Sequence, residues 1–341
     1  MGPCGGYRPP LPGRLAGSGY ASVVSEKTTT LTLQAPPRFD LHRAVCSYGY
    51  FILAPNHWDV KARVLHRPLR TAAGRVVKTT LRQRADRTLV LACGRAVPRG
   101  DHATLKNQVR RMLRFDEDFT AWRALHPLAK KRRFDRMFRS PTLFEDVVKT
   151  VTSCNVTWAN TIQMNRLMVE HVGHGGFPTP EQLADFGEAR LKERCRVGYR
   201  AGRIVQLARD VVKGEIVLDG FEEPGRKSGE LFEAFRGIYG IGPYAAGNLC
   251  HLVGAYDRLA IDTETYRHFC LQHQVKRPRG ADAAGLKRLH TKIENHYERY
   301  APFQFLAYWF ELWEDYQARC GPAWGWDRET TGACFTASQL K

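Results

Sequence analysis

A glycine-rich turn between two predicted helices is the first feature that could do chemistry. Residues 231–246 show two helical stretches joined by a turn that holds Gly240, Ile241 and Gly242, and Pro243 suits the first position of the second helix. Glycine permits the positive φ and the close approach that such a turn requires. Backbone N–H groups at the start of the second helix can bind a phosphate without reading base sequence, although an ordinary tight helical hairpin would have the same residues.

A single carboxylate follows this hairpin. Asp262 stands 18 residues after Tyr244 and directly before a predicted helix that begins at Thr263. An aspartate in this position most often caps the helix, because its side chain accepts hydrogen bonds from backbone N–H groups. It can also stabilise positive charge that develops on a bound substrate. The residues around Asp262 leave both roles open.

These residues belong to a helical region that follows a small β region. Short β-branched or alternating runs predict antiparallel strands at His57–Leu65, Arg75–Leu81 and Thr88–Cys93. After Asp101 a 3.6-residue period predicts helices at Ala103–Arg114, Asp116–Leu125, Thr142–Thr152, Trp158–Val172, Pro180–Ala184, Glu188–Cys195, Arg200–Lys213, Glu230–Arg236, Tyr244–Val253, Thr263–Cys270, Gly285–Tyr300 and Phe303–Tyr316. The predicted fold class is therefore α+β, mostly α.

Composition divides the chain further. Residues 1–35 are rich in Gly, Pro, Ser and Thr and are predicted to form a flexible tail. A β domain is expected over residues 36–115, a helical domain over 116–318 and a C-terminal tail over 319–341.

Charge and cysteine usage limit the classes of partner. The 52 Lys and Arg residues exceed the 34 Asp and Glu residues, and the formal net charge of +18 points to a polyanion such as nucleic acid. No apolar run approaches the roughly 20 residues that span a bilayer, so no membrane association is expected. The nine cysteines are scattered singly, which predicts reduced thiols in an intracellular protein with no disulfide framework, no metal site and no cofactor.

The stretch from Gly237 to Arg267 resembles the hairpin, loop and aspartate of the helix-hairpin-helix (HhH-GPD) DNA glycosylases. Asp262 takes the place of the essential loop aspartate of that superfamily, and the resemblance implies a two-lobed helical body behind the β domain. The similarity runs from about Phe39 to Tyr316 and is closest to the branch of the 8-oxoguanine and alkyladenine glycosylases.

Several shorter segments extend this resemblance. Thr152–Thr157 is similar to the loop that fills the space left by a flipped base, which makes Asn155 the candidate plug. Val197–Ala201 resembles another family segment, and Tyr199 and Arg200 within it are expected to contact DNA.

The chain departs from the family at the catalytic and pocket positions. Members with lyase activity carry a lysine nucleophile where this sequence has Tyr244, so strand cleavage is not expected. The cysteine, phenylalanine and glutamine that hold 8-oxoguanine correspond here to Asn248, Trp309 and Phe305, and Gly49 matches a family glycine at the lesion. An 8-oxoguanine specificity is therefore in doubt, and the aromatic residues favour an electron-poor base such as an alkylated purine.

The sequence thus predicts a monofunctional DNA glycosylase that acts as a monomer on double-stranded DNA with a damaged or mismatched base. A DNA substrate implies the nucleus or a DNA-containing organelle as the location. Two alternatives stay open: a catalytically inert protein that binds damaged DNA through the hairpin, and a bifunctional glycosylase and abasic-site lyase that uses another amine.

Overall fold

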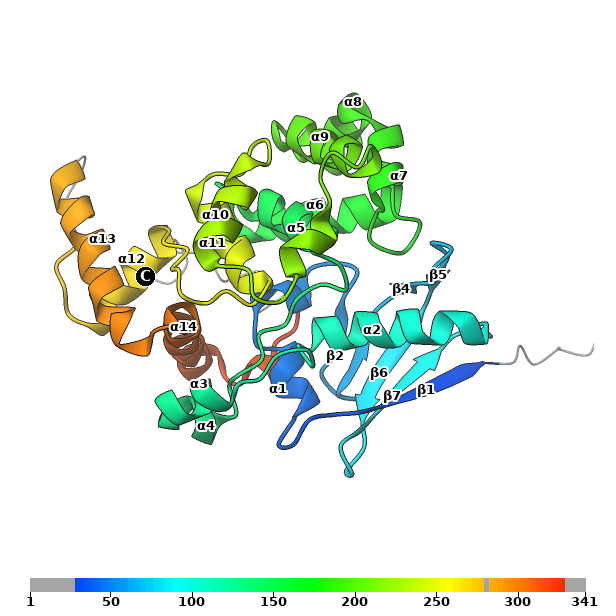
Figure 1. Ribbon diagram of the computed structural model, residues 1–341, viewed down its shortest axis with the longest axis horizontal. Coiled ribbons are helices and arrows are strands. Elements are labelled where there is room, and N and C mark those ends of the chain that lie inside the picture. The colour runs from blue at the N-terminus through cyan, green and yellow to red at the C-terminus, as the bar shows by residue number, and fades with distance from the viewer. Residues whose placement is uncertain (1–27, 279–281, 329–341) are drawn as a thin grey trace, which may run out of the picture.

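The computed structural model describes residues 28–278 and 282–328 (Figure 1). A small antiparallel β region packs against a larger set of helices, and the predicted α+β, mostly α class is confirmed. None of the helices in these ranges is both long enough and apolar enough to cross a membrane.

The β region is a five-stranded antiparallel sheet with a separate two-stranded ribbon. Its strand order is β1-β7-β6-β3-β2, and β4 pairs with β5. The strands are β1 Thr29–Gln34, β2 His57–Asp59, β3 Val64–His66, β4 Leu69–Arg70, β5 Val76–Val77, β6 Thr79–Gln83 and β7 Thr88–Cys93. The predicted single strand His57–Leu65 is wrong, because the chain turns back through Arg63 at φ 53° and β2 pairs with β3.

The predicted bounds of both tails, 1–35 and 319–341, include residues that are folded. Residues 30–33 alternate threonine and leucine, and the leucines of β1 are buried opposite β7, so the sheet begins before residue 36. At the other end, Trp326 is 2% exposed and its indole N–H donates to the Gly321 carbonyl at 2.8 Å. The residues that follow 318 therefore belong to the folded domain as far as the structure describes them. Residues 1–27 and 329–341 of the predicted tails lie outside the described residues.

Fourteen helices are found in the described ranges, against twelve predicted. They are α1 Leu41–Val45, α2 His102–Met112, α3 Thr120–Leu125, α4 Pro127–Arg132, α5 Leu143–Ser153, α6 Trp158–His171, α7 Pro180–Phe186, α8 Glu188–Cys195, α9 Arg200–Val212, α10 Ser228–Gly237, α11 Pro243–Leu252, α12 Thr263–Gln272, α13 Ala283–Tyr297 and α14 Gln304–Cys320. Helices α5–α11 contact one another, and α12–α14 form a second group with α3 and α4 nearby (Figure 1).

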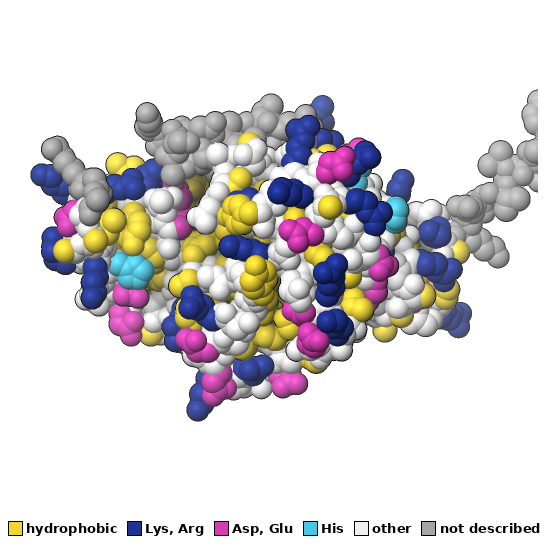
Figure 2. All heavy atoms as spheres, turned by 90° about the horizontal axis from the view of Figure 1, so that it is seen from above, with side chains coloured by type: hydrophobic (Ala, Val, Ile, Leu, Met, Phe, Trp, Pro, Cys, Tyr) yellow, Lys and Arg dark blue, Asp and Glu magenta, His cyan; other side chains and the backbone are white. Residues whose placement is uncertain are grey.

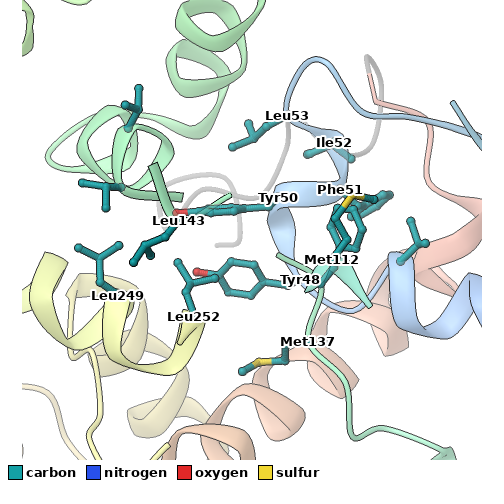
Figure 3. Packing of buried hydrophobic residues seen from close by; sticks show 14 of the residues in the cluster. Tyr48, Tyr50, Phe51, Ile52, Leu53, Met112, Met137, Leu143, Leu249 and Leu252 are labelled. Carbon is teal, nitrogen blue, oxygen red and sulfur yellow. The ribbon is translucent and has the colours of Figure 1, made fainter. Parts of the chain in front are cut away.

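The segment after α1 joins these parts. Tyr48 and Tyr50 extend from the short 3-10 helix Gly49–Ile52 toward α5 and α11, where Leu249 and Leu252 pack (Figure 3). On its other side the same segment holds α14, because the indole N–H of Trp313 donates to the Cys46 carbonyl at 3.0 Å. Residues 46–52 therefore contact both groups of helices and link them.

Candidate active site

The predicted hairpin is formed by α10 and α11. Gly240 has φ 83°, a left-handed conformation that side chains rarely adopt, so glycine is required there. The side chains of Ile238 and Ile241 are buried beneath the turn and anchor it. Pro243 occupies the first turn of α11, whose N-terminus has no side-chain cap and therefore leaves backbone N–H groups for an anion.

The structure adds detail to two of the predicted hairpin residues. The N–H of Ile241 donates to the Ile238 carbonyl at 3.0 Å, so this amide is already engaged within the turn. Gly242 has φ −86° and ψ 177°, which any residue can adopt, and an added Cβ would meet open space. The requirement for positive φ that the sequence suggested for both glycines applies to Gly240 alone.

Asp262 is the N-cap of α12, as its position before the helix predicted. Its Oδ1 accepts hydrogen bonds from the backbone N–H of Thr265 at 2.8 Å and from the Thr265 hydroxyl at 3.0 Å. Burial raises the pKa of the carboxyl, although the bonds from Thr265 oppose this shift. One oxygen of a partly desolvated carboxylate is thus fixed by the cap, and the side chain borders a cavity.

Tyr244 lies in the first turn of α11 and faces Asp262. Burial, and then the nearby charge of Asp262, raise the pKa of the Tyr244 hydroxyl well above its usual range, and a hydrogen bond to Asp262 acts in the same direction. The hydroxyl of Tyr244 is therefore protonated and neutral. The structure brings together the two residues that the sequence singled out for catalysis and for the replaced lysine.

Asp262 and Tyr244 open onto a cavity of about 370 Å³. Its walls come from residues 48–52, the loop between α5 and α6, the first turns of α11 and α12, and α14. They include Tyr48, Gly49, Trp158, Asn248, Phe305, Tyr308 and Trp309. A carboxylate at the edge of an aromatic cavity of this size is suited to hold one planar ring beside a bond to be broken.

Comparison with solved structures identifies this architecture. A 3-methyladenine DNA glycosylase from Archaeoglobus fulgidus covers 84% of this chain and 98% of its own, with a TM-score of 0.61 and 18% identity. The structure of MBOgg1 in complex with a low affinity DNA ligand covers 83% of this chain and 96% of its own, with a TM-score of 0.58 and 20% identity. The Clostridium acetobutylicum 8-oxoguanine glycosylase/lyase, solved with double-stranded DNA, covers 79% of this chain and 92% of its own, with a TM-score of 0.52 and 18% identity. The chain has the helix-hairpin-helix DNA glycosylase fold. No protein-family model and no curated protein matches the sequence.

Within this glycosylase fold, α14 supplies the aromatic wall of the cavity. Phe305 and Trp309 lie parallel, with ring centroids 6.1 Å apart and planes 6° apart. The Phe305 ring also contacts His251, stacked at 3.9 Å, and Tyr308, edge-on at 5.9 Å, so Phe305 is buried although it lines the cavity. The Trp309 indole N–H donates to the Ser47 carbonyl at 2.9 Å, which holds the ring in place. Trp309 is thus the better-exposed stacking surface of the two predicted residues.

Asn248 lines the cavity of the glycosylase fold but is itself held by neighbours. Its Oδ1 accepts hydrogen bonds from the Tyr48 hydroxyl at 2.9 Å and from His251 Nε2 at 3.0 Å. Burial lowers the pKa of His251 well below its usual range, so the imidazole is neutral. The sequence missed both partners of Asn248. The three-residue spacing of Asn248 and His251 along one helix could have indicated the second.

The remaining pocket residue, Gly49, opens the 3-10 helix Gly49–Ile52 and lines the cavity as predicted. A Cβ added there would lie 3.0 Å from Cζ2 of the Trp158 indole. The absent side chain lets the backbone approach Trp158 and leaves room at the cavity wall.

The loop between α5 and α6 presents Asn155 to solvent. Asn155 is exposed with φ 51°, and its carbonyl accepts a hydrogen bond from Arg200 Nη2 at 3.2 Å. Arg200 is buried and also donates to the Cys154 carbonyl, so the prediction that it contacts DNA directly is replaced by a supporting role beneath the loop. Tyr199 is 54% exposed, with the guanidinium groups of Arg200 and Arg203 over its ring.

Proposed function

We propose that this protein is a monofunctional DNA glycosylase that removes a damaged base from double-stranded DNA. The observation that carries the proposal is the half-buried carboxylate of Asp262 at an aromatic cavity, with Tyr244 in the place of a lysine nucleophile. The phosphate-binding geometry of the hairpin and the net charge of +18 support DNA as the substrate.

The proposed reaction uses Asp262 electrostatically. As the bond between the base and the sugar lengthens, its electron pair leaves with the base and positive charge develops on the sugar ring. The carboxylate of Asp262 offsets that charge. A water then adds to the sugar carbon and gives up a proton to the carboxylate or to solvent. The products are a free base and an intact abasic strand.

The cavity favours a cationic, electron-poor base such as an alkylated purine. Trp309 is a partly exposed, electron-rich ring in the cavity wall, and cations bind to such rings. The oxygen of the Asn248 amide already accepts two hydrogen bonds from the protein, which leaves it little capacity to read a base edge. An alkylated purine also leaves as a neutral base once the glycosidic bond breaks, so the cavity need not protonate it.

The test is a panel of duplexes that each carry one lesion: an N-alkylated purine, 8-oxoguanine, uracil opposite guanine, or no damage. Base release is measured directly, and strand breakage is measured with and without hot alkali. We expect release from the alkylated duplex and breakage only after alkali. Binding without release from any duplex would instead support an inert damage-binding protein, and breakage without alkali would support a lyase.

Gly240→Val is expected to weaken binding to damaged and undamaged duplexes alike. A β-branched residue at φ 83° costs about 1–3 kcal/mol, its Cβ also clashes with the Arg203 side chain, and both effects distort the turn whose amides face the phosphate. Lys and Arg side chains are spread over the face seen in Figure 2, so the residual affinity of the variant should still fall as salt rises. Binding is measured by fluorescence anisotropy at several salt concentrations.

The matched control is Gly214→Val. Gly214 also has a positive φ, 76°, with open space around an added Cβ, but lies in the loop after α9. This variant carries the same kind of backbone strain away from the hairpin and should bind DNA as the wild type does. Equal loss of affinity in both variants would contradict a DNA contact at the hairpin.

A further inference from the structure

Three histidines surround one carboxylate on the side of α12 away from the cavity. Glu311 of α14 accepts hydrogen bonds at Oε1 from His268 Nε2 at 2.9 Å and from His273 Nε2 at 3.0 Å. The ring of His296, from α13, lies 4.2 Å from the ring of His273 between centroids. One nitrogen or oxygen from each of His273, His296 and Glu311 lies within 4.8 Å of the other two.

We propose that His273, His296 and Glu311 form a binding site for a divalent transition-metal ion, with Zn²⁺ as the best match. Two imidazoles and one carboxylate are a ligand set that zinc accepts, and a fourth position remains for water or a further side chain. Zinc bonds of about 2.0–2.1 Å in a tetrahedron place ligand atoms about 3.4 Å apart. The ligand atoms, which now lie within 4.8 Å of one another, would have to close to that spacing when the ion binds.

The surroundings are those of a built metal site. Phe269 packs against the rings of His273 at 4.5 Å and His296 at 5.3 Å, which limits water access from one side. His268 Nε2 donates to the Glu311 carboxylate, while its Nδ1 lies 3.6 Å from Asp315. Such a carboxylate and histidine pair behind a ligand orients it and raises its basicity.

Arg299 competes with the metal ion for His296. Its Nη2 donates to His296 Nε2 at 3.1 Å from an exposed position. The guanidinium of Arg299 occupies Nε2 of His296 and repels a divalent cation. The exposed Arg299 side chain must therefore rotate away from His296 when a metal ion binds. Its removal should therefore strengthen metal binding, whereas loss of a ligand should weaken it.

The proposed ion would stabilise the arrangement of the helices that carry active-site residues. It would join the C-terminal end of α12, which begins after Asp262, to α13 and to α14, which carries Phe305 and Trp309. No catalytic step passes through it, so metal binding can be measured without any assumption about glycosylase activity.

The test is equilibrium dialysis and calorimetric titration of the metal-free, full-length protein with Zn²⁺ alone. We expect one ion per chain, at least tenfold weaker binding by His273→Gln and by His296→Gln, and tighter binding by Arg299→Ala. The matched control is His171→Gln, which removes an exposed histidine of α6 and should change nothing. Circular dichroism of each variant checks that it is folded.

Seven unpaired cysteines lie in the described part of the chain and could also take up zinc, so Co²⁺ is used as a second probe. Bound Co²⁺ should show the visible absorption of a tetrahedral nitrogen and oxygen site without sulfur charge-transfer bands. Equal zinc uptake by the wild type and the two histidine variants, or thiolate bands with Co²⁺, would overturn the proposal.

Discussion

Asp262→Asn is expected to lower the rate of base release by about 10²–10³ while leaving duplex binding largely intact. The amide of asparagine cannot offset the positive charge that develops on the sugar. It can still accept the hydrogen bond from the Thr265 backbone, because asparagine is as good an N-cap as aspartate. The fold and the DNA-binding surface should therefore survive the change, and single-turnover kinetics would report the lost charge.

The same variant should be at least as stable as the wild type. Burial raises the pKa of Asp262 in the folded state, so the folded protein holds this proton more tightly than the unfolded chain does. The contribution of Asp262 to stability is full below the unfolded pKa and is lost as pH rises through the folded pKa. At neutral pH the buried charge is a cost that asparagine removes. The difference in melting temperature between the two proteins should shrink as pH falls.

Asp282→Asn is the matched control for Asp262→Asn. Asp282 caps α13 by accepting the Gly285 N–H at 2.7 Å, and it is not among the residues that line the cavity. It should release base at the wild-type rate. Near-normal turnover by Asp262→Asn on its best substrate would contradict the catalytic assignment. A wild-type pH profile with no loss of rate on the acid side would also contradict it, because protonation of Asp262 has the same effect as the amide.

Local signals predicted much of the fold. Helix α8 was predicted at its observed bounds, Glu188–Cys195, and β7 at Thr88–Cys93, because both have a clear period and clear end signals. The turn at Arg63 was missed, since a non-glycine residue at φ 53° leaves no mark in the sequence. Strand β1 was read as part of a tail because its pairing with β7 joins residues about 60 positions apart.

The residues of the candidate site also fall into those that local sequence could predict and those that it could not. The hairpin glycines, Tyr244 and Asp262 fall within one short stretch, so local spacing could identify them. Tyr48 bonds to Asn248 across 200 residues, and that contact depends on the whole fold. Arg200 was expected to contact DNA because Val197–Ala201 resembles a segment of the glycosylase family. Burial beneath the Asn155 loop, which decides its role, cannot be read from sequence.

The presence of Tyr244 in place of a lysine predicts that borohydride traps no covalent adduct between the protein and DNA. A lyase forms an imine between an amine and the opened sugar, and borohydride reduces that imine to a permanent covalent adduct. The phenol of Tyr244 is held neutral and cannot form an imine. Among the described residues that line the cavity there is no lysine, and buried Lys149 is paired with Glu145 at 2.6 Å, away from the cavity walls. We expect no trapped adduct with the wild type on any lesion that it excises.

Tyr244→Lys tests the geometry behind this expectation. The new amine would lie beside Asp262, whose charge favours the ammonium form, while burial favours the neutral nucleophile. Any trapping should therefore appear only as pH rises and should be lost in the Tyr244→Lys, Asp262→Asn double variant if the carboxylate assists the chemistry. Tyr244→Phe, the matched control, removes only the hydroxyl and should give no adduct at any pH. Efficient trapping by the unmutated protein, measured as a shifted band on a denaturing gel, would show that another amine reaches the sugar and that the protein is a lyase.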